Sequence, residues 1–412
     1  MTRRDFLKTS AAAAAATTVP TGVFASGSDV IKIGLIGCGG RGTGAAMDAA
    51  AANPNVVVWS MGDLFADHLT NSRKSLSDAL GQRSRTTDDR AFSGFDAYKK
   101  VLATDVDVVL LTTPPVFRPI HLKAAIEANK HVFMEKPVAT DAPGARSVME
   151  SSALAASKKL CIVAGTQRRH DVAYNEAMKR IHDGQMGDVV ACYAYWNQGG
   201  LWNIPRTASM SDMEWQLRNW LYFAWVSGDH ICEQHIHNLD VCNWAMNTHP
   251  VKATSLAGRQ VRTDPSYGHI FDHFGTEYEY ANGVKMLSMC RQIDGTASRV
   301  AEHIVGTKGT SNANTMIKGE KSWRFDGERP NPYMLEHRDL YNAIASGKYI
   351  NEGQRVAEST LTAIMGRMSA YTGQEITWEM AMNSTETHVP TKWEFGPLPV
   401  QPVAVPGITK FA

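Results

Sequence analysis

Residues 30–134 alternate between continuous apolar runs and stretches in which apolar and polar residues are mixed. The apolar runs predict buried strands over Val30–Ile36, Val56–Trp59, Val106–Thr112 and His131–Met134. Helices are predicted between them, over Thr43–Ala52 and Pro119–Ala128. Strands that are apolar on both faces and alternate with helices form parallel sheets covered on both sides. We therefore expect an α/β domain in the first part of the chain.

The pattern changes near residue 160, where apolar and polar positions alternate along longer segments. This alternation predicts strands over Val189–Trp196, Ala253–Val261, Ile270–Tyr280, Val284–Gln292 and Glu302–Val305. Helical segments are predicted over Asp171–His182, Cys232–Met246, Tyr333–Ala345 and Val356–Thr372. Strands with one exposed face indicate an α+β domain whose large open sheet is mostly antiparallel, with helices on one side. The tail from Asn383 holds five prolines and little periodicity, so we expect it to wrap over the surface.

Length and composition agree with a two-domain globular protein. The chain has 412 residues, which exceeds the usual size of one domain. We place the first domain at residues 29–157, the second at 158–382 and the surface-wrapping tail at 383–412. The formal net charge is +1, with 42 basic and 41 acidic residues, so no nucleic-acid partner is expected. After residue 28, no apolar stretch reaches the ~18 residues of a membrane span.

Residues 1–28 have the pattern of an export signal. Arg3-Arg4 is followed by Phe6-Leu7-Lys8, by an alanine-rich apolar run over Ala11–Val19 and by small residues ending at Ala25. Together these features predict a twin-arginine signal peptide, and a disordered basic tail is the alternative. Because the twin-arginine route carries folded proteins, we expect a periplasmic protein that holds its cofactor tightly.

A glycine-rich loop follows the first predicted strand. Gly37, Gly39 and Gly42 fit the spacing G-x-G-x-x-G, with Gly40 and Arg41 between them. Placed between a strand and a helix, this spacing allows a tight turn and brings backbone amides close to a pyrophosphate. The sequence therefore predicts a Rossmann domain that binds a dinucleotide.

Asp63 lies about 20 residues beyond the loop, after the second predicted strand. A carboxylate there accepts hydrogen bonds from the adenosine ribose hydroxyls, which favours NAD over NADP. Two other interpretations stay open: Asp63 could be an acidic residue of a surface turn, and Arg41 could bind the 2′-phosphate of NADP. We expect NAD, with NADP as the less favoured cofactor.

The tripeptide Glu135-Lys136-Pro137 follows the strand that ends at Met134. Open α/β sheets hold their ligands at the carboxyl ends of the strands, which is where Lys136 falls. A lysine ammonium there can donate a hydrogen bond to a hydroxyl or keto oxygen and take part in proton transfer. Without its context, the tripeptide would more often be an exposed loop.

Ionisable residues are concentrated between Asp229 and Asp240. On a single helix, His230, Glu233, His237 and Asp240 would lie in a row along one face. Carboxylates and imidazoles together suit acid–base catalysis, and the same spacing also suits a metal. We predict substrate contacts from Asp229, His230 and His237 and assign no metal. A polar helix with satisfied histidines is the alternative.

An aromatic and arginine-rich segment precedes that cluster. It contains Trp196, Trp202, Trp215, Trp220 and Trp225. Indole faces stack on the C–H faces of sugars, while polar side chains bind the hydroxyls. We predict that Trp202 and Arg206, with Arg168 and Arg169 from the preceding Gln167–His170 segment, contact the substrate. A Trp-rich core or an oligomer contact is the alternative.

Taken together, these residues resemble the glucose-fructose oxidoreductase/inositol dehydrogenase (Gfo/Idh/MocA) family. The resemblance covers roughly residues 30–380 and rests on the glycine loop, Thr112-Thr113-Pro114-Pro115, Glu135-Lys136-Pro137 and His237-Asn238-Leu239-Asp240. It implies a Rossmann domain and a second domain with a large open sheet that often forms oligomers. Members oxidise or reduce a carbon of a sugar or cyclitol with NAD(P). We therefore expect a homo-oligomer, dimer or tetramer, with a sugar or cyclitol substrate.

The resemblance also assigns roles to single residues. Lys136 matches the catalytic lysine of the family, and His237 matches its acid–base histidine. Glu233 falls where many relatives have aspartate, so we assign it to catalysis on weaker grounds. Thr113 and Pro114 are expected near the nicotinamide, and Glu135 with the cofactor-binding residues.

These residues are compatible with three functions. The first is an NAD-dependent oxidoreductase acting on a secondary alcohol of a sugar, glycoside or cyclitol, with a tightly bound nucleotide. The second is an NAD-dependent glycosidase or lyase that oxidises its substrate transiently. The third is a non-catalytic protein that binds a sugar or nucleotide, which the presence of both Lys136 and His237 argues against.

Overall fold

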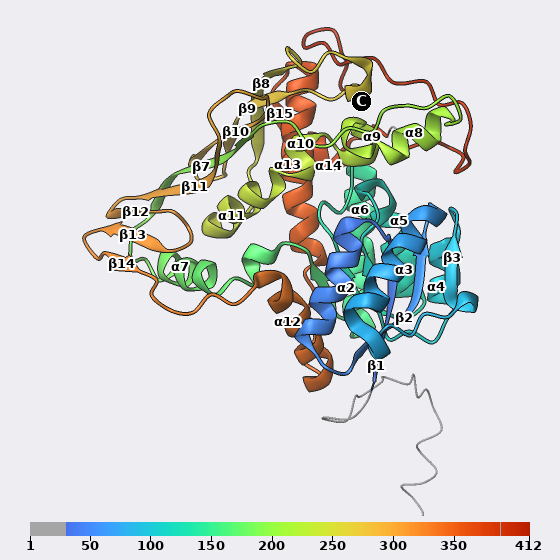
Figure 1. Ribbon diagram of the computed structural model, residues 1–412. Coiled ribbons are helices and arrows are strands. Elements are labelled where there is room, and N and C mark those ends of the chain that lie inside the picture. Colours follow the sequence, from blue (N-terminus) through green and yellow to red (C-terminus); the bar gives the residue numbers. More distant parts are fainter. Residues whose placement is uncertain (1–29, 388) are drawn as a thin grey trace, which may run out of the picture.

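The computed structural model describes residues 30–387 and 389–412, so the predicted signal peptide at 1–28 lies outside the described residues. A first domain holds a six-stranded sheet, and a second domain holds a nine-stranded sheet. Figure 1 shows the first domain in blue to teal and the larger sheet in green to orange. The predicted fold class, a Rossmann domain followed by an α+β domain, is confirmed.

All strand pairs of the first sheet are parallel, in the order β3-β2-β1-β4-β5-β6. The strands are β1 (Ile31–Ile36), β2 (Val56–Asp63), β3 (Ala91–Ser93), β4 (Val108–Leu111), β5 (His131–Met134) and β6 (Ile162–Ala164). Side chains of β1, β2, β4 and β5 are almost fully buried, as continuous apolar runs require. β6 lies beyond residue 157, at which the sequence ended this domain.

Helices cover both faces of this sheet. On one face lie α2 (Gly40–Ala52), α3 (Ala66–Leu80) and α12 (Pro332–Ser346). On the other lie α4 (Ala97–Leu102), α5 (Arg118–Glu127) and α6 (Ala142–Ser157). Because α12 buries Leu340 and Ile344 in the core beneath α2, a segment that the sequence placed in the second domain completes the first.

The second sheet has the order β14-β13-β12-β11-β7-β10-β9-β8-β15. Every neighbouring pair is antiparallel except β7 and β10. The strands are β7 (Val189–Gln198), β8 (Lys252–Gly258), β9 (His273–Glu279), β10 (Lys285–Gln292), β11 (Arg299–Gly306), β12 (Gly309–Ser311), β13 (Met316–Gly319), β14 (Trp323–Arg324) and β15 (Ile376–Thr377).

The helices of the second domain lie on the side of this sheet that faces the first domain (Figure 1). They are α7 (Val172–His182), α8 (Asp212–Arg218), α9 (Ala224–Ser227), α10 (His230–Glu233), α11 (Ile236–Met246), α13 (Gly353–Thr372) and α14 (Trp378–Asn383). Short 3₁₀ turns are η1 (Gly81–Arg83), η2 (Asp88–Arg90), η3 (Pro115–Phe117), η4 (Gln167–Arg169), η5 (Trp220–Tyr222) and η6 (Pro265–Tyr267). α13 packs against both α6 and β8, so it ties the two domains together.

One predicted helix is divided in the structure. The sequence predicts a continuous helix over Cys232–Met246, but α10 ends at Glu233 and α11 begins at Ile236. The break is fixed by side chains: His235 Nε2 lies 2.7 Å from Ser288 Oγ on β10, and the Gln234 side chain is bound by two strand residues. The prediction that His230, Glu233, His237 and Asp240 lie in one row on a helix is therefore wrong.

The outer face of the second sheet carries an apolar stripe. The register places Leu256 of β8 opposite Gly275, Gly275 opposite Met289 of β10, and Met289 opposite Tyr195 of β7. Leu287 lies two residues from Met289 on the same face. Leu256, Leu287 and Met289 are 85%, 44% and 49% exposed, so no described residue covers the stripe.

Candidate active site

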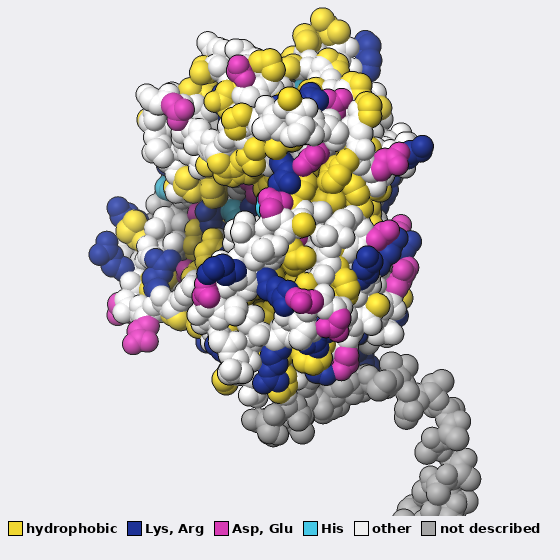
Figure 2. All heavy atoms as spheres, turned by 45° about the vertical axis from the view of Figure 1, so that its right-hand side comes forward, with side chains coloured by type: hydrophobic (Ala, Val, Ile, Leu, Met, Phe, Trp, Pro, Cys, Tyr) yellow, Lys and Arg dark blue, Asp and Glu magenta, His cyan; other side chains and the backbone are white. Residues whose placement is uncertain are grey.

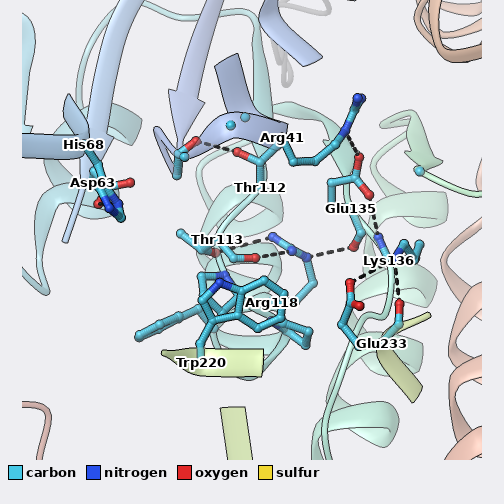
Figure 3. A pocket seen from close by; sticks show the side chains of 18 of the residues that line it. Arg41, Asp63, His68, Thr112, Thr113, Arg118, Glu135, Lys136, Trp220 and Glu233 are labelled. Carbon is cyan, nitrogen blue, oxygen red and sulfur yellow. Dashed lines mark hydrogen bonds and ion pairs between the residues drawn. The ribbon is translucent and has the colours of Figure 1, made fainter. Parts of the chain in front are cut away.

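A cleft of about 440 Å³ lies at the carboxyl ends of β1, β2, β4 and β5, where open α/β sheets bind ligands. The first domain contributes the glycine loop, Asp63, Thr113, Pro114, Glu135 and Lys136 to its lining. The second domain closes the cleft with Trp196, Leu217, Trp220, Glu233, Gln234 and His237. Figure 3 shows how Lys136 and Glu233 meet across the cleft.

The glycine loop forms a tight turn with one open side. Gly37 has a φ of +102°, and a Cβ there would lie 2.5 Å from the Thr113 amide nitrogen. A Cβ on Gly42 would lie 1.9 Å from the Gly37 carbonyl oxygen. A Cβ on Gly39 or Gly40 would meet nothing within 4 Å. Gly39 precedes α2 without a side-chain cap, so the first amides of α2 remain available for a pyrophosphate. The loop therefore fits a dinucleotide.

Asp63 ends β2 at one side of the cleft (Figure 3). Its Oδ2 accepts a hydrogen bond from the Cys38 amide at 2.5 Å, and its Oδ1 accepts one from the Phe65 amide at 2.8 Å. His68 Nδ1 lies 3.6 Å from Oδ1, and the Asp63 carboxylate raises the pKa of His68. The carboxylate is thus fixed against the glycine loop and faces the cleft as a hydrogen-bond acceptor.

Arg41 lies on the other side of the cleft, beside Glu135 (Figure 3). Its Nε donates to Glu135 Oε1 at 2.6 Å, and its guanidinium lies 3.5 Å from Asp48 and 3.8 Å from Glu336. Three acidic side chains therefore surround this one positive charge, although burial raises the pKa of Glu336 well above its usual value. The Tyr333 ring lies 4.9 Å from the guanidinium carbon.

Lys136 connects the two domains at the end of β5. Its Nζ donates to the Glu233 carbonyl oxygen at 2.6 Å and to Glu233 Oε1 at 3.1 Å. Both side chains are only 14% exposed. The ammonium is therefore held in a defined position, with its remaining N–H available to a ligand in the cleft.

His237 lies on the first turn of α11 and is 7% exposed. Its ring stacks on Trp196 at a centroid distance of 5.8 Å. Burial, together with the positive charges of Lys136 and Arg168, lowers the pKa of His237 well below its usual value of 6.5. The imidazole is therefore uncharged at neutral pH and can accept a proton.

Six residues predicted to bind substrate are not part of the cleft lining: Arg168, Arg169, Trp202, Arg206, Asp229 and His230. Their side chains are engaged elsewhere. Arg168 forms an ion pair with Glu302, Arg169 with Asp240, and Arg206 with Asp212. These side chains therefore lie outside the cleft lining, and their role in substrate binding stays a prediction.

The other three residues, Trp202, Asp229 and His230, are held by packing and hydrogen bonds and do not line the cleft. Trp202 is 44% exposed and packs against Trp220 at a centroid distance of 5.8 Å. Asp229 is fully buried, where it accepts hydrogen bonds from the His230 and Phe271 amides and from the Tyr371 hydroxyl. His230 is fully buried against Phe274. Within the described parts of the chain, no three His, Cys, Asp or Glu residues are grouped so that they could hold a metal ion.

The structure adds cleft residues that the sequence did not single out. They include His68, Phe117, Arg118, Gln234 and Tyr333. Tyr333 lies in the first turn of α12, almost 200 residues after Lys136, and no local pattern connects the two. Gln234 had a usable signal, because it lies between the two predicted catalytic residues Glu233 and His237.

The tail and α8 fasten the second domain to the first beside this cleft. The Trp393 ring lies 4.8 Å from Phe117 and 6.3 Å from Trp225, and Phe395 stacks on Phe65 at 5.9 Å. We call these five residues, Trp393, Phe395, Phe117, Trp225 and Phe65, the aromatic clasp. Figure 2 shows hydrophobic side chains gathered where the upper part of the molecule meets the first domain.

Polar contacts hold the clasp in place. Leu398 accepts a hydrogen bond from Gln216 Nε2 at 2.6 Å and donates one to Asp212 Oδ2 at 3.0 Å, which fixes the tail on α8. Arg218 of α8 forms an ion pair with Asp67 of α3 at 3.1 Å, and its guanidinium lies 3.9 Å from the Phe65 ring. The two domains are therefore joined on the Asp63 side of the cleft.

Comparison with known proteins agrees with this geometry. Residues 31–166 match an oxidoreductase family with an NAD-binding Rossmann fold, Gfo/Idh/MocA, and residues 1–20 match the twin-arginine translocation signal. Inositol 2-dehydrogenase 3 of Saccharopolyspora erythraea is 25% identical over 256 residues, which are 62% of this chain and 65% of that protein. 2,7-Anhydro-N-acetylneuraminate hydratase of Escherichia coli is 26% identical over 208 residues, 50% of each chain. The chain thus spans less than two thirds of either curated relative.

A solved structure shares the fold. Scyllo-inositol dehydrogenase from Lactobacillus casei, with bound NAD(H) and scyllo-inositol, has a TM-score of 0.64 and 17% identity, covering 85% of this chain and 100% of that one. Fold and glycine loop together define an NAD-binding oxidoreductase domain of the Rossmann type. Residues 31–166 belong to the Gfo/Idh/MocA oxidoreductase family. The predicted family and the predicted export signal are thereby confirmed.

No helix in the described parts of the chain is both long and apolar enough to cross a membrane.

Proposed function

We propose that this protein is an exported NAD-dependent oxidoreductase that acts on a secondary alcohol of a sugar, glycoside or cyclitol. The observation that carries the proposal is the meeting of Lys136 and His237, from different domains, in the same cleft as the glycine loop. The family of residues 31–166 supports the redox chemistry, and the inositol 2-dehydrogenase relative supports a cyclitol or a similar polyol.

Each cleft residue has its own role in the proposed oxidation of the alcohol. Bound NAD would supply the hydride acceptor. Uncharged His237 accepts the hydroxyl proton, while Lys136 Nζ donates a hydrogen bond to the same oxygen as negative charge develops on it. Glu233 keeps the Lys136 ammonium in place through two hydrogen bonds. The indole of Trp196 offers an apolar face to the C–H bonds of a polyol.

NAD is the cofactor that the electrostatics favour. Asp63 would accept hydrogen bonds from the adenosine ribose hydroxyls but would repel a 2′-phosphate. Arg41 does not compensate, because Glu135, Asp48 and Glu336 already surround its guanidinium. Thr113, Pro114 and Glu135 line the same cleft and are our proposed neighbours of the nicotinamide half.

We also propose that the nucleotide stays bound through many turnovers. The aromatic clasp joins the domains on the Asp63 side, so release would require its separation. Export to the periplasm by the twin-arginine route, which we infer from the N-terminal signal, would carry such a loaded protein. A retained nucleotide must be regenerated on the enzyme, so each cycle would be redox-neutral overall.

A second candidate is a lyase, hydratase or glycosidase that oxidises its substrate transiently and then reduces it again. The relative named as a hydratase favours it, because adding water is redox-neutral. The same Lys136 and His237 would move the hydroxyl proton in both directions.

The decisive experiment uses the full chain purified from its native export route. Heat-denatured protein should release NAD(H), identified by mass spectrometry. The folded protein is then mixed with myo-inositol, scyllo-inositol, D-glucose and chromogenic glycosides while absorbance at 340 nm is followed. Reduction of added NAD identifies a dehydrogenase that exchanges its nucleotide, whereas product formation without net NADH identifies a cycle on a retained nucleotide. In that case an oxidised and a reduced product formed together identify redox exchange between two polyols, and a single cleaved, hydrated or dehydrated product identifies the second candidate. Protein with neither bound nucleotide nor affinity for NAD(H) would leave only the non-catalytic binding function.

The apolar stripe on the second sheet supports a homo-oligomer, dimer or tetramer, in which two such faces pack together. Replacing Leu256 and Met289 by Asp would place charges in that contact, and we expect the particle mass to fall by half, from a dimer to one chain or from a tetramer to a dimer. Light scattering after gel filtration measures the change. Val405→Asp is the matched control, because Val405 is a 47% exposed residue of the tail. Unchanged mass in the Leu256/Met289 variant would refute this interface.

A further inference from the structure

A chain of amide side chains runs from the second sheet into the cleft. Trp196 Nε1 donates to Gln198 Oε1 at 2.9 Å, and Gln198 Nε2 donates to Gln234 Oε1 at 3.2 Å. A second branch reaches the same oxygen: Arg262 donates to Gln292 Oε1, and Gln292 Nε2 donates to Gln234 Oε1 at 2.5 Å. Gln292 is fully buried.

Both branches begin at groups that can only donate. An indole N–H and a guanidinium have no acceptor, so the amides of Gln198 and Gln292 must present their oxygens to them. Their nitrogens then face Gln234, whose carboxamide oxygen receives both hydrogen bonds. The amide nitrogen of Gln234 is left for the cleft that the residue lines, and it donates to no described residue.

Gln234 lies beside the proposed catalytic residues. The preceding residue, Glu233, holds Lys136 through its carbonyl oxygen, and His237 lies three residues further on. An amide N–H fixed beside Lys136 and His237 can donate a hydrogen bond to a second oxygen of the same substrate. It also disfavours a protonated amine at that point, because two donors would then face each other.

We propose that Gln234 is a specificity-determining residue that binds an acceptor oxygen of a polyol next to the reacting hydroxyl and rejects an ammonium group there. The proposal rests on the proposed polyol oxidoreductase function. It assigns Gln234 to binding, whereas Lys136 and His237 act on the reacting atoms. Gln198, Gln292, Trp196 and Arg262 fix the direction of the Gln234 amide.

The test is Gln234→Glu, which keeps an acceptor oxygen for Gln198 and Gln292 but replaces the donor. For the polyol of the panel that the wild type turns over best, we expect KM to rise about 10–100-fold, with kcat changed much less. Gln82→Glu adds the same charge at an exposed position outside the cleft lining and should leave both constants unchanged. Bound NAD(H) should be equal in all three proteins.

A set of analogues separates recognition from mere structural support. Mono-deoxy analogues of that polyol should include one for which wild type and Gln234→Glu have the same KM. The analogue with an amine at the same carbon should be used better by Gln234→Glu than by the wild type. Equal penalties for every analogue, or an unchanged KM for the parent polyol, would overturn the assignment. If the wild type neither binds nor converts any polyol, the proposed function fails first and this assignment falls with it.

Discussion

Replacing Lys136 by Met should lower kcat by about 10²–10⁴-fold while the protein still binds NAD(H). Methionine preserves the length of the side chain but removes the ammonium that Glu233 holds in the cleft. The developing charge on the substrate oxygen would then lack its donor. Initial rates with the best polyol of the panel, together with nucleotide content, measure the effect. Lys74→Met, an exposed lysine of α3 paired with Asp78, is the control.

Substitution of His237 by Gln should cause a loss of similar size and should also change the pH dependence. Because burial, Lys136 and Arg168 depress the pKa of His237, the imidazole stays uncharged as the pH falls through 6.5. The acidic limb of kcat/KM for alcohol oxidation is therefore expected below pH 6.5, and it should disappear in the variant. Turnover within a few-fold of wild type in both Lys136→Met and His237→Gln would exclude them from catalysis.

Much of the first domain could be predicted because its strands leave a local signal. β1, β2, β4 and β5 are buried on both faces, and a strand in that environment must be continuously apolar. β3 and β6 have three residues each, which is too short for such a run to be distinguished. α12 packs on the first sheet from a position far along the chain, so no local pattern indicates this contact.

In the candidate site, too, the residues positioned by local strand ends could be predicted, whereas those fixed by distant contacts could not. The glycine loop and Lys136 could be predicted because they directly follow β1 and β5, whose apolar runs are recognisable. Asp63 could be predicted because it ends β2, the strand after the glycine loop. Arg168 and Arg169 look like ligands in the sequence, but their charges are neutralised by Glu302 and Asp240, which lie 134 and 71 residues away. The break at Gln234 was hidden for a similar reason, because its anchors are on β7 and β10.

Loss of the aromatic clasp should make the protein exchange its nucleotide. In the double variant Trp393→Ala/Phe395→Ala, we expect NAD(H) to be released about 10²-fold faster than from wild type. Removing a large aromatic side chain from a full core costs about 3–5 kcal/mol. Trp393 is partly buried and Phe395 is 45% exposed, so we take about 2.5 kcal/mol for the two rings together, and each ~1.4 kcal/mol corresponds to a tenfold change. Decay of bound NADH fluorescence after dilution into excess NAD measures the rate.

Two further variants show which contact holds the domains together. Asp67→Asn removes the charge that pairs with Arg218 but leaves the Arg218 guanidinium on the Phe65 ring. The Asp67 side chain is 54% exposed, and a pair so exposed contributes little, so release should change less than about fivefold. Ile408→Ala alters the same tail at a residue that is 71% exposed and outside the clasp, and it should leave release unchanged. A wild-type protein that already exchanges NADH within seconds would contradict nucleotide retention. A slow wild type with an equally slow clasp variant would refute the role of the clasp in retention.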